Sequence, residues 1–363
     1  MKLIISAGGT GGHIYPAIAI INKLKEIDKN IDILYIGTTD RMEKDIIPNL
    51  NIPFIGIEMK GLNRKNVFKN INVLHSLHLA VLKVTKIIDD FKPDVVIGVG
   101  GYITFPVIYA AYKLKIKTFI HEQNSIPGLS NKILSKYADK IGISLPGSLK
   151  YFKKAKTVLT GNPRSEEVYN ATNVSLTSYN LDKDKKTVLI VMGSLGSLTI
   201  NNLFKDILLK FNKKNYQVLF VSGKNYYDEF KKIKLPNNVV VVPFIKNMVN
   251  VLKSVDLIVS RSGASTIAEI TAAKLPSILI PSPYVTHNHQ YMNALELKNK
   301  DACILLEEKD LNAKTLIDKI DLILNDKTLY MQLKDNTKKL AITNSASKIV
   351  EIIIDLANGE KHE

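Results

Sequence analysis

The sequence contains a single cysteine, Cys303, and no tryptophan. One thiol can form neither an internal disulfide framework nor a multi-cysteine metal site, and it suits a reducing compartment. No apolar run approaches the ~18–20 residues of a membrane-spanning helix, and the chain enters a strand pattern at once, which argues against a signal peptide. With 363 residues, 45% of them hydrophobic and 23% charged, the chain predicts a soluble or peripheral globular protein with room for two domains.

Acidic residues are scarce relative to basic ones. The chain has 50 Lys and Arg against 34 Asp and Glu, a net charge of +16. Residues 1–163 hold 23 basic and 12 acidic residues, a net +11, whereas residues 164–363 hold 27 and 22, a net +5. The asymmetry predicts an anionic membrane surface as a partner of the first half. No nucleic-acid motif and no basic stripe interleaved with aromatics occurs, so nucleic acid is not an expected partner.

Arginine is also scarce. In a chain this rich in lysine, each arginine indicates a position where the planar guanidinium group, with its several hydrogen-bond donors, is needed. The four arginines are Arg41, Arg64, Arg164 and Arg261.

Short β-branched runs alternate with helix-period segments along the chain, and the alternation starts again at residue 187. This pattern predicts an α/β protein with two Rossmann-like, doubly wound parallel-sheet domains facing a deep cleft. In the first half the apolar runs begin at residues 3, 32, 53, 94, 117 and 140, with helical stretches at 14–28 and 67–90. The predicted domains are residues 1–163 and 164–340, followed by a C-terminal helix at 341–363 that packs back on the first domain, with 170–186 as an irregular connection.

The first glycine loop reads SAGGTGGHIYP at residues 6–16, between a strand and a helix. It has no Walker A lysine, and the third glycine of the dinucleotide fingerprint falls on Ile14, so neither a P-loop nor a nicotinamide site is predicted. Amides at a helix N-terminus favour an anionic ligand, although a tight turn is the alternative. His13 lies at the helix start, where the dipole disfavours the imidazolium, and a neutral ring can act as a general base on a hydroxyl.

A second glycine loop, residues 98–102 (GVGGY), follows another predicted strand, and residues 121–124 (HEQN) follow a third. The two glycine loops are predicted to share one sheet edge and to hold an anionic group between them, the alternative being two unrelated turns. Four consecutive hydrogen-bonding side chains at 121–124 suit a polyhydroxylated ligand; a plain polar loop is the alternative.

In the second half, residues 260–269 (SRSGASTIAE) lead from a strand into a helix. The amides of its small residues can face a diphosphate, Arg261 adds positive charge, and Glu269 can accept both hydroxyls of a ribose. Capping and dipole compensation is the alternative for Glu269. His287 and His289 lack a third ligand, and the Asp-x-Asp sequence at 182–184 lies in the irregular connection, so neither a metal nor a cofactor is predicted.

Taken together and in this order, these stretches resemble glycosyltransferase family 28 over nearly the whole chain. The matching motifs are GGTGGHIYPA, GVGGY, HEQNSIPGLSN, TGNPRSE, SRSGASTIAE and the segment from Gln290 to Ala294. The resemblance implies the GT-B fold and an inverting transfer of N-acetylglucosamine from UDP-GlcNAc. The implied acceptor is the C4 hydroxyl of undecaprenyl-pyrophosphoryl-MurNAc-pentapeptide, so that lipid I becomes lipid II in peptidoglycan synthesis. The enzyme would be peripheral, on the cytoplasmic face of the bacterial cell membrane.

Other functions share parts of this pattern: a related GT-B glycolipid glycosyltransferase, a UDP-sugar epimerase, and a non-catalytic UDP-sugar sensor. The GGTGGH and HEQN segments argue against the first two, and an intact His13 with both glycine loops argues against the third.

The resemblance also implies residue roles. His13 is the implied catalytic base. Donor contacts are implied for Thr10, Gly11, Gly12, Asn124, Arg164, Ser165, Ser194, Ile245, Arg261, Ala264, Ser265, Thr266, Glu269 and Gln290. Acceptor contacts are implied for Gly11, Gly12, Gly100, Gly101, Tyr102, Glu122 and Asn124. The arginine of TGNPRS lies one place earlier than in many members, which leaves the choice between Arg164 and Ser165 open.

A membrane contact is predicted on the helical stretch around residues 71–84. Leu74, Leu77, Val81 and Val84 recur there at roughly helical spacing among lysines. A core-facing stripe on an ordinary helix is the alternative.

Overall fold

The computed structural model describes residues 1–59, 61, 70–193 and 198–359, and the chain divides into two compact units. Unit 1 comprises Met1–Arg164 and Asn344–Glu363, and unit 2 comprises Ser165–Thr343. The predicted boundary after residue 163 and the observed one after Arg164 differ by one residue.

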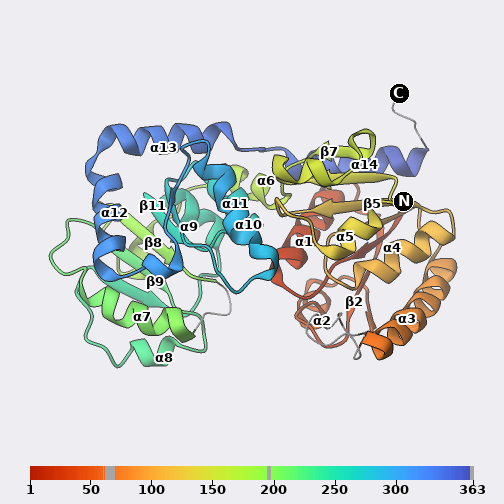
Figure 1. Ribbon diagram of the computed structural model, residues 1–363, viewed down its shortest axis with the longest axis horizontal. Coiled ribbons are helices and arrows are strands. Elements are labelled where there is room, and N and C mark those ends of the chain that lie inside the picture. The colour runs from red at the N-terminus through yellow and green to blue at the C-terminus, as the bar shows by residue number, and fades with distance from the viewer. Residues whose placement is uncertain (60, 62–69, 194–197, 360–363) are drawn as a thin grey trace. The chain divides into compact units, whose positions relative to one another are not determined.

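Unit 1 is built on a seven-stranded sheet of order β3-β2-β1-β4-β5-β6-β7, parallel throughout (Figure 1). Its strands are β1 (Lys2–Ser6), β2 (Asp32–Thr38), β3 (Phe54–Ile57), β4 (Val95–Gly98), β5 (Lys117–Glu122), β6 (Lys140–Ile143) and β7 (Thr157–Leu159). The first six follow the predicted runs. Strand β7 was not predicted, because a run of three residues between Lys156 and Thr160 gives too short a pattern.

Helices cover the sheet of unit 1, and the C-terminal helix is one of them. The helices are α1 (Gly11–Ile27), α2 (Glu43–Ile46), α3 (Asn70–Phe91), α4 (Thr104–Lys113), α5 (Leu129–Leu134) and α14 (Ser345–Asn358), with short 3-10 turns at Pro48–Leu50, Pro146–Tyr151 and Lys154–Lys156. Ile349, Val350 and Ile353 of α14 are fully buried in the same apolar cluster as Ile5 and Ile20. The last helix therefore completes the core of the first unit.

Helix α3 does not present the predicted stripe as one surface. Val84 is fully buried in the core with Ile88, because Ala80, Val84 and Ile88 form the face of α3 that belongs to the apolar cluster shared with α4 and the sheet. Leu74 points outward with 59% of its surface exposed, and Leu77 lies half-buried at the edge of the core. The prediction was therefore wrong for Val84 and agrees with the exposure of Leu74. Among the described residues no helix, α3 included, combines the length and apolarity needed to cross a membrane.

Unit 2 has a six-stranded parallel sheet of order β10-β9-β8-β11-β12-β13, so the predicted pair of doubly wound α/β domains is confirmed. Its strands are β8 (Thr187–Val191), β9 (Gln217–Val221), β10 (Val239–Val242), β11 (Leu257–Ser260), β12 (Ser277–Leu279) and β13 (Ile304–Leu305). Its helices are α7 (Leu198–Leu209), α8 (Tyr227–Phe230), α9 (Met248–Ser254), α10 (Ala264–Ala273), α11 (His289–Lys298), α12 (Ala313–Asn325) and α13 (Lys327–Lys339), and α6 (Arg164–Asn170) bridges the boundary. Short 3-10 turns lie at Leu176–Tyr179, Thr286–Asn288 and Glu308–Asp310.

Candidate functional site

The two glycine loops of unit 1 meet at the carboxyl edge of the sheet. Strands β1 and β4 are neighbours in the sheet, and the strand order changes direction between them. Ligands of doubly wound sheets bind at such a switch point. The Gly8 amide donates to the Gly100 carbonyl at 3.1 Å. A Cβ atom on Gly101 would overlap the Gly8 carbonyl, so the loops can approach this closely only without a side chain at 101. The predicted shared edge is confirmed.

His13 is the third residue of α1, in the first turn of the helix. Its amide donates to the Thr10 carbonyl at 3.0 Å, and its Nδ1 lies 3.1 Å from the Gly8 carbonyl oxygen. A carbonyl only accepts, so Nδ1 carries the proton and Nε2 holds the ring lone pair in the neutral tautomer. Helix α1 has no acidic residue in its first turn, and its Gly11 and Gly12 amides lie at the positive end of the helix dipole. The site thus places a ring nitrogen that can accept a proton beside a helix end whose amides can bind an anion.

Residues 121–124 were predicted to offer their side chains to a ligand, and for the first three this is wrong. His121, Glu122 and Gln123 are each no more than 2% exposed. Glu122 accepts hydrogen bonds from the Asn124 and Gly128 amides and from Asn131, so its carboxylate organises the loop 123–131. The implied acceptor contact of Glu122 is therefore corrected.

His121 lies between two parts of unit 1. Nε2 donates to the Gly161 carbonyl at 2.9 Å, and Nδ1 accepts from Gln123, whose amide also donates to Val99 in the second glycine loop. Complete burial lowers the pKa of His121 to about 4, against the smaller opposing effect of the Gly161 hydrogen bond. His121 is thus a neutral structural histidine.

Between Arg164 and Ser165 the structure separates the open alternatives. Ser165 is 2% exposed, and its hydroxyl donates to the Ile342 carbonyl at 2.5 Å, so its implied donor contact is corrected. Arg164 is half-buried, and its guanidinium carbon lies 5.8 Å from the ring centroid of Tyr15 on α1. Arg164 therefore remains the candidate of the two.

In unit 2 the loop after β11 leads into α10 at the equivalent break in strand order, between β8 and β11. Gly263 caps α10 with an extended backbone and no side-chain cap, so the amides of the first turn point toward the loop. Ser265, Thr266 and Glu269 are half-buried and share one helix face at spacings of three and four, whereas Ala264 is 7% exposed. This face can hold a ligand by amides, hydroxyls and a carboxylate together.

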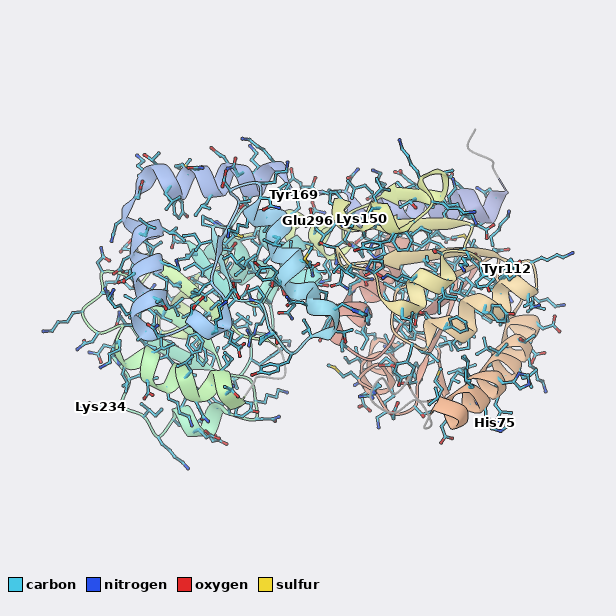
Figure 2. The ribbon with its side chains drawn as sticks, in the orientation of Figure 1. His75, Tyr112, Lys150, Tyr169, Lys234 and Glu296 are labelled. Atoms are coloured by element: carbon cyan, nitrogen blue, oxygen red, sulfur yellow. The ribbon has the colours of Figure 1, made fainter. Side chains whose placement is uncertain are left out.

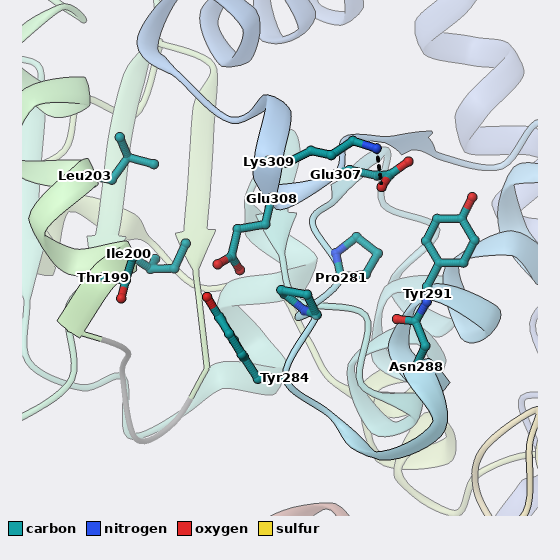
Figure 3. A pocket seen from close by; sticks show the side chains of 11 residues that line it. Thr199, Ile200, Leu203, Pro281, Tyr284, Asn288, Tyr291, Glu307, Glu308 and Lys309 are labelled. Atoms are coloured by element: carbon teal, nitrogen blue, oxygen red, sulfur yellow. Dashed lines mark ion pairs between the residues drawn. The ribbon is translucent and has the colours of Figure 1, made fainter.

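Arg261 has partners within unit 2. Its guanidinium donates to the Ile280 carbonyl at 3.0 Å and pairs with Glu308 at 2.5 Å, both side chains being about nine-tenths buried. Glu308 of this pair lines a cavity of about 340 Å³, shown in Figure 3, whose walls also include Pro281, Tyr284 and Tyr291. The arginine therefore fixes the loop before α10, and the free charge predicted for it is already neutralised by Glu308.

The remaining predicted residues of unit 2 differ in how far the structure describes them. Gln290 is half-buried, and its side-chain oxygen accepts from the Ser282 amide at 2.8 Å, which leaves the amide nitrogen to donate. Ile245 is 2% exposed, so only its backbone can meet a ligand, and the neighbouring Phe244 is 57% exposed. Ser194 lies outside the described residues.

Arg41 and Glu43 follow β2 at the same sheet edge as the glycine loops, and the sequence motifs gave neither residue a role. The Arg41 guanidinium donates a hydrogen bond to the Tyr102 hydroxyl. This contact with Tyr102 is the largest cause of a raised pKa of Arg41, and the charges of Asp40 and Glu43 add smaller effects in the same direction. The available signal was the arginine itself, retained in a chain that otherwise uses lysine. Glu43 is fully buried and gave no such signal.

Among the described residues no cluster of three or more His, Cys, Asp or Glu side chains is placed to hold a metal ion. Burial raises the pKa of the Cys303 thiol to about 12, so this cysteine is not a nucleophile at neutral pH.

Comparison with known proteins gives concordant matches to both units. Residues 3–143 match the glycosyltransferase family 28 N-terminal domain, and residues 187–351 match the glycosyltransferase family 28 C-terminal domain. The chain is 47% identical over 362 residues to the UDP-N-acetylglucosamine--N-acetylmuramyl-(pentapeptide) pyrophosphoryl-undecaprenol N-acetylglucosamine transferase of Halalkalibacterium halodurans, with 98% of this chain and 100% of the relative covered. The transferase of the same name from Bacillus subtilis is 44% identical, with 98% and 99% covered. The crystal structure of Acinetobacter baumannii MurG has a TM-score of 0.79 at 24% identity, covers 98% and 99% of the two chains, and at that identity supports the fold alone.

Proposed function

The chain belongs to glycosyltransferase family 28, and from this premise we propose that it transfers N-acetylglucosamine from UDP-GlcNAc to lipid-linked N-acetylmuramyl-pentapeptide. The full-length relatives at 44–47% identity carry this activity in their names. The observation that carries the proposal is His13, whose Nδ1–H is fixed on the Gly8 carbonyl at the junction of two glycine loops. A base and an anion site side by side suit an acceptor that has a hydroxyl next to a pyrophosphate.

In unit 1 the proposed chemistry is proton removal. His13 Nε2 takes the proton of the muramyl C4 hydroxyl as that oxygen attacks the anomeric carbon, and inversion follows from a single displacement. The Gly11 and Gly12 amides and the Gly100–Tyr102 loop hold the acceptor pyrophosphate, with Thr10 and Asn124 at their margins. Arg41, oriented by Tyr102, adds a positive charge at the same edge.

In unit 2 the proposed task is to bind UDP and to stabilise it as it leaves. The α10 amides from Ala264 to Thr266 take the developing negative charge of the diphosphate, a role that needs preorganised donors. Glu269 accepts from the ribose hydroxyls, the Ile245 backbone meets uracil, and the Gln290 amide donates to the sugar. The Arg261–Glu308 pair keeps the loop before α10 in place.

We also propose peripheral binding to the cytoplasmic face of an anionic membrane, through α3 and α4. On α3 the side chains of Leu74, Leu79 and Leu82 are 59%, 51% and 56% exposed, and Lys83 and Lys86 are exposed beside them. A cavity of about 330 Å³ lies between the two helices, lined by Leu74, Leu77, His78, Val81, Phe105, Tyr109 and Tyr137. Figure 2 places His75 and Tyr112 on the outer faces of these helices. Apolar side chains ringed by lysines suit a surface with anionic headgroups.

The test is a transfer assay with UDP-GlcNAc labelled in the sugar and either lipid I or diacylglycerol as acceptor. We expect label in the lipid I product only, with UDP release that depends on the acceptor. Transfer to diacylglycerol would indicate a glycolipid glycosyltransferase, and interconversion of the UDP-sugar without acceptor would indicate an epimerase. Tight UDP-GlcNAc binding without transfer to either acceptor would indicate a sensor.

A further inference from the structure

A carboxyl group is buried directly beneath the first glycine loop. Glu43 begins α2 (Figure 1), and its side chain is 0% exposed. Oε1 accepts from the Thr38 amide at 3.0 Å and from the Thr38 hydroxyl at 2.7 Å, and Oε2 accepts from the Gly9 amide at 3.2 Å. Burying a carboxylate is costly unless donors surround it, and here they join the end of β2 to the loop.

Two glycines make room for this one side chain. A Cβ atom on Gly8 would overlap Glu43 Oε1, and a Cβ atom on Gly37 would lie 2.6 Å from Glu43 Cγ. The chain therefore keeps glycine at two positions, Gly8 in the loop after β1 and Gly37 in β2, so that the carboxyl group can reach the loop. Tyr35 holds the loop from the same side, since its hydroxyl donates to the Ala7 carbonyl at 2.9 Å. Burial, and then the charge of Glu43, raise the pKa of Tyr35.

The Gly9 amide and the Gly8 carbonyl belong to one peptide group. No cis peptide occurs among the described residues, so the N–H and C=O of this group point in opposite directions. Glu43 Oε2 accepts from its N–H, and its carbonyl accepts from His13 Nδ1 at 3.1 Å. A carboxylate and the imidazole thus bind opposite edges of the same peptide. A negative group on the N–H polarises the peptide and makes its carbonyl a stronger acceptor.

We propose that Glu43 is a positioning residue for the transfer reaction, acting on His13 through the Gly8–Gly9 peptide. The carboxyl group fixes the orientation of that peptide, and the carbonyl then holds the His13 ring in the tautomer that carries its lone pair on Nε2. As Nε2 takes the proton, the polarised carbonyl stabilises the imidazolium. The arrangement parallels a carboxylate that orients a histidine directly, with a peptide group inserted between them. The proposal rests on the proposed role of His13.

The test compares Glu43→Gln with Thr38→Val. The glutamine has the shape of Glu43 but only one oxygen. If that oxygen accepts the hydrogen bonds of Thr38, the glutamine NH₂ group faces the Gly9 N–H, and two donors cannot bond each other. We expect kcat to fall about 10-fold to 100-fold, the range for losing a hydrogen bond to a charged group, with KM for UDP-GlcNAc within about 2-fold because unit 2 is untouched. Thr38→Val removes a hydrogen bond to the same carboxyl group but keeps both amide contacts, so it should lower stability and leave kcat near wild type. Equal losses of kcat in the two variants, or none in Glu43→Gln, would overturn the proposal.

A second measurement does not depend on activity, and its first part uses the wild-type chain alone. Nitrogen-15 spectra of His13 in the full wild-type chain should show Nδ1 protonated and Nε2 unprotonated, and Glu43→Gln should shift the ring toward a mixture of tautomers. A wild-type ring protonated on Nε2 alone would overturn the proposal even if transfer occurs. A chain that shows the expected tautomer and its dependence on Glu43 but transfers no sugar would contradict the proposed function and support this inference.

Discussion

Gly100 lies against the imidazole of His13, so closely that a Cβ atom on Gly100 would come within 2.5 Å of His13 Cδ2 and 3.0 Å of Nε2. The second glycine loop is thus one wall of the space that the proposed base occupies. Its backbone has φ of +110° at this glycine, a conformation that other residues rarely adopt.

Gly100→Ala should therefore displace the His13 ring without touching unit 2. We expect kcat for lipid I to fall at least ~10-fold, since a misplaced catalytic group is costly, while UDP affinity by calorimetry stays unchanged. Gly128→Ala is the matched control, because Gly128 has an ordinary backbone conformation and a Cβ atom there would have no neighbour within 4 Å. Equal activity of the two variants would show that the Gly100–His13 contact does not matter for transfer.

His13→Ala should lower kcat ~10²-fold or more, the usual scale for loss of a general base. UDP-GlcNAc binding should change little, because His13 is not proposed to contact the donor. His75→Ala, on the outer face of α3 (Figure 2), is the control, and detergent-solubilised acceptor keeps membrane binding out of the comparison. Turnover near wild type in His13→Ala would remove this residue from the role.

Glu269→Ala should lower the affinity for UDP about 10-fold to 100-fold, the range for losing a hydrogen bond to a charged group. Calorimetry with UDP and with 2′-deoxy-UDP isolates the ribose contact. Wild type should prefer UDP, and the variant should bind both alike. Glu296→Ala on the neighbouring helix α11 (Figure 2) should keep the preference. A preference for UDP that survives in Glu269→Ala would leave this glutamate only a helix-dipole role.

The sequence predicted where functional loops lie better than where side chains point. The glycine loops at 8–12 and 98–102 were predictable because glycine clusters after apolar runs indicate strand-to-helix turns, and parallel strands bring such turns to one edge. Glu122 and Ser165 were misassigned because a polar residue after a strand looks the same whether it faces a ligand or bonds its own loop. Their burial is decided by packing that only the folded chain determines.

Glu43 shows the same limit in reverse. Nothing in the sequence indicates that a glutamate between Met42 and Lys44 is buried, because a charged residue in a short polar stretch is typical of surface turns. Only the folded chain shows that Gly8 and Gly37 leave the space it occupies. Val84 was misplaced for a related reason: helical spacing identifies an apolar face but not whether that face meets the sheet or the outside.

Buried neutral His121 makes the stability of unit 1 depend on pH. Its pKa is about 4 when folded and about 6.5 when unfolded, so between these values the unfolded chain binds a proton that the folded chain does not. Stability is therefore unaffected above about pH 6.5 and falls as pH decreases toward 4, by up to about 3 kcal/mol from this group. Denaturant unfolding followed by circular dichroism at pH 7 and pH 5 measures the loss. His121→Gln should be less stable at pH 7 yet lose less between the two pH values; an identical loss would assign the dependence to other groups.

Membrane docking through α3 can be distinguished from non-specific hydrophobic binding by comparing leucines of similar exposure on α3 and on α12. Leu74→Glu combined with Leu82→Glu removes two side chains that are 59% and 56% exposed on α3, whereas Leu322→Glu removes one that is 51% exposed on α12 of unit 2. Burying a half-exposed leucine contributes about 1 kcal/mol, and the added carboxylates are repelled by anionic headgroups. Binding of the double variant to anionic vesicles should therefore fall at least ~10-fold.

Leu322→Glu should bind such vesicles like wild type, and all variants should transfer sugar to a detergent-solubilised acceptor at the wild-type rate, because these leucines lie outside the proposed site. Wild-type binding should need anionic lipid and weaken steeply as salt rises, since the Debye length shrinks from about 10 Å at 0.1 M to about 3 Å at 1 M. A double variant that still binds, or wild-type binding that is indifferent to salt and lipid charge, would show that the +11 charge of residues 1–163 and the exposed leucines of α3 do not form the docking surface.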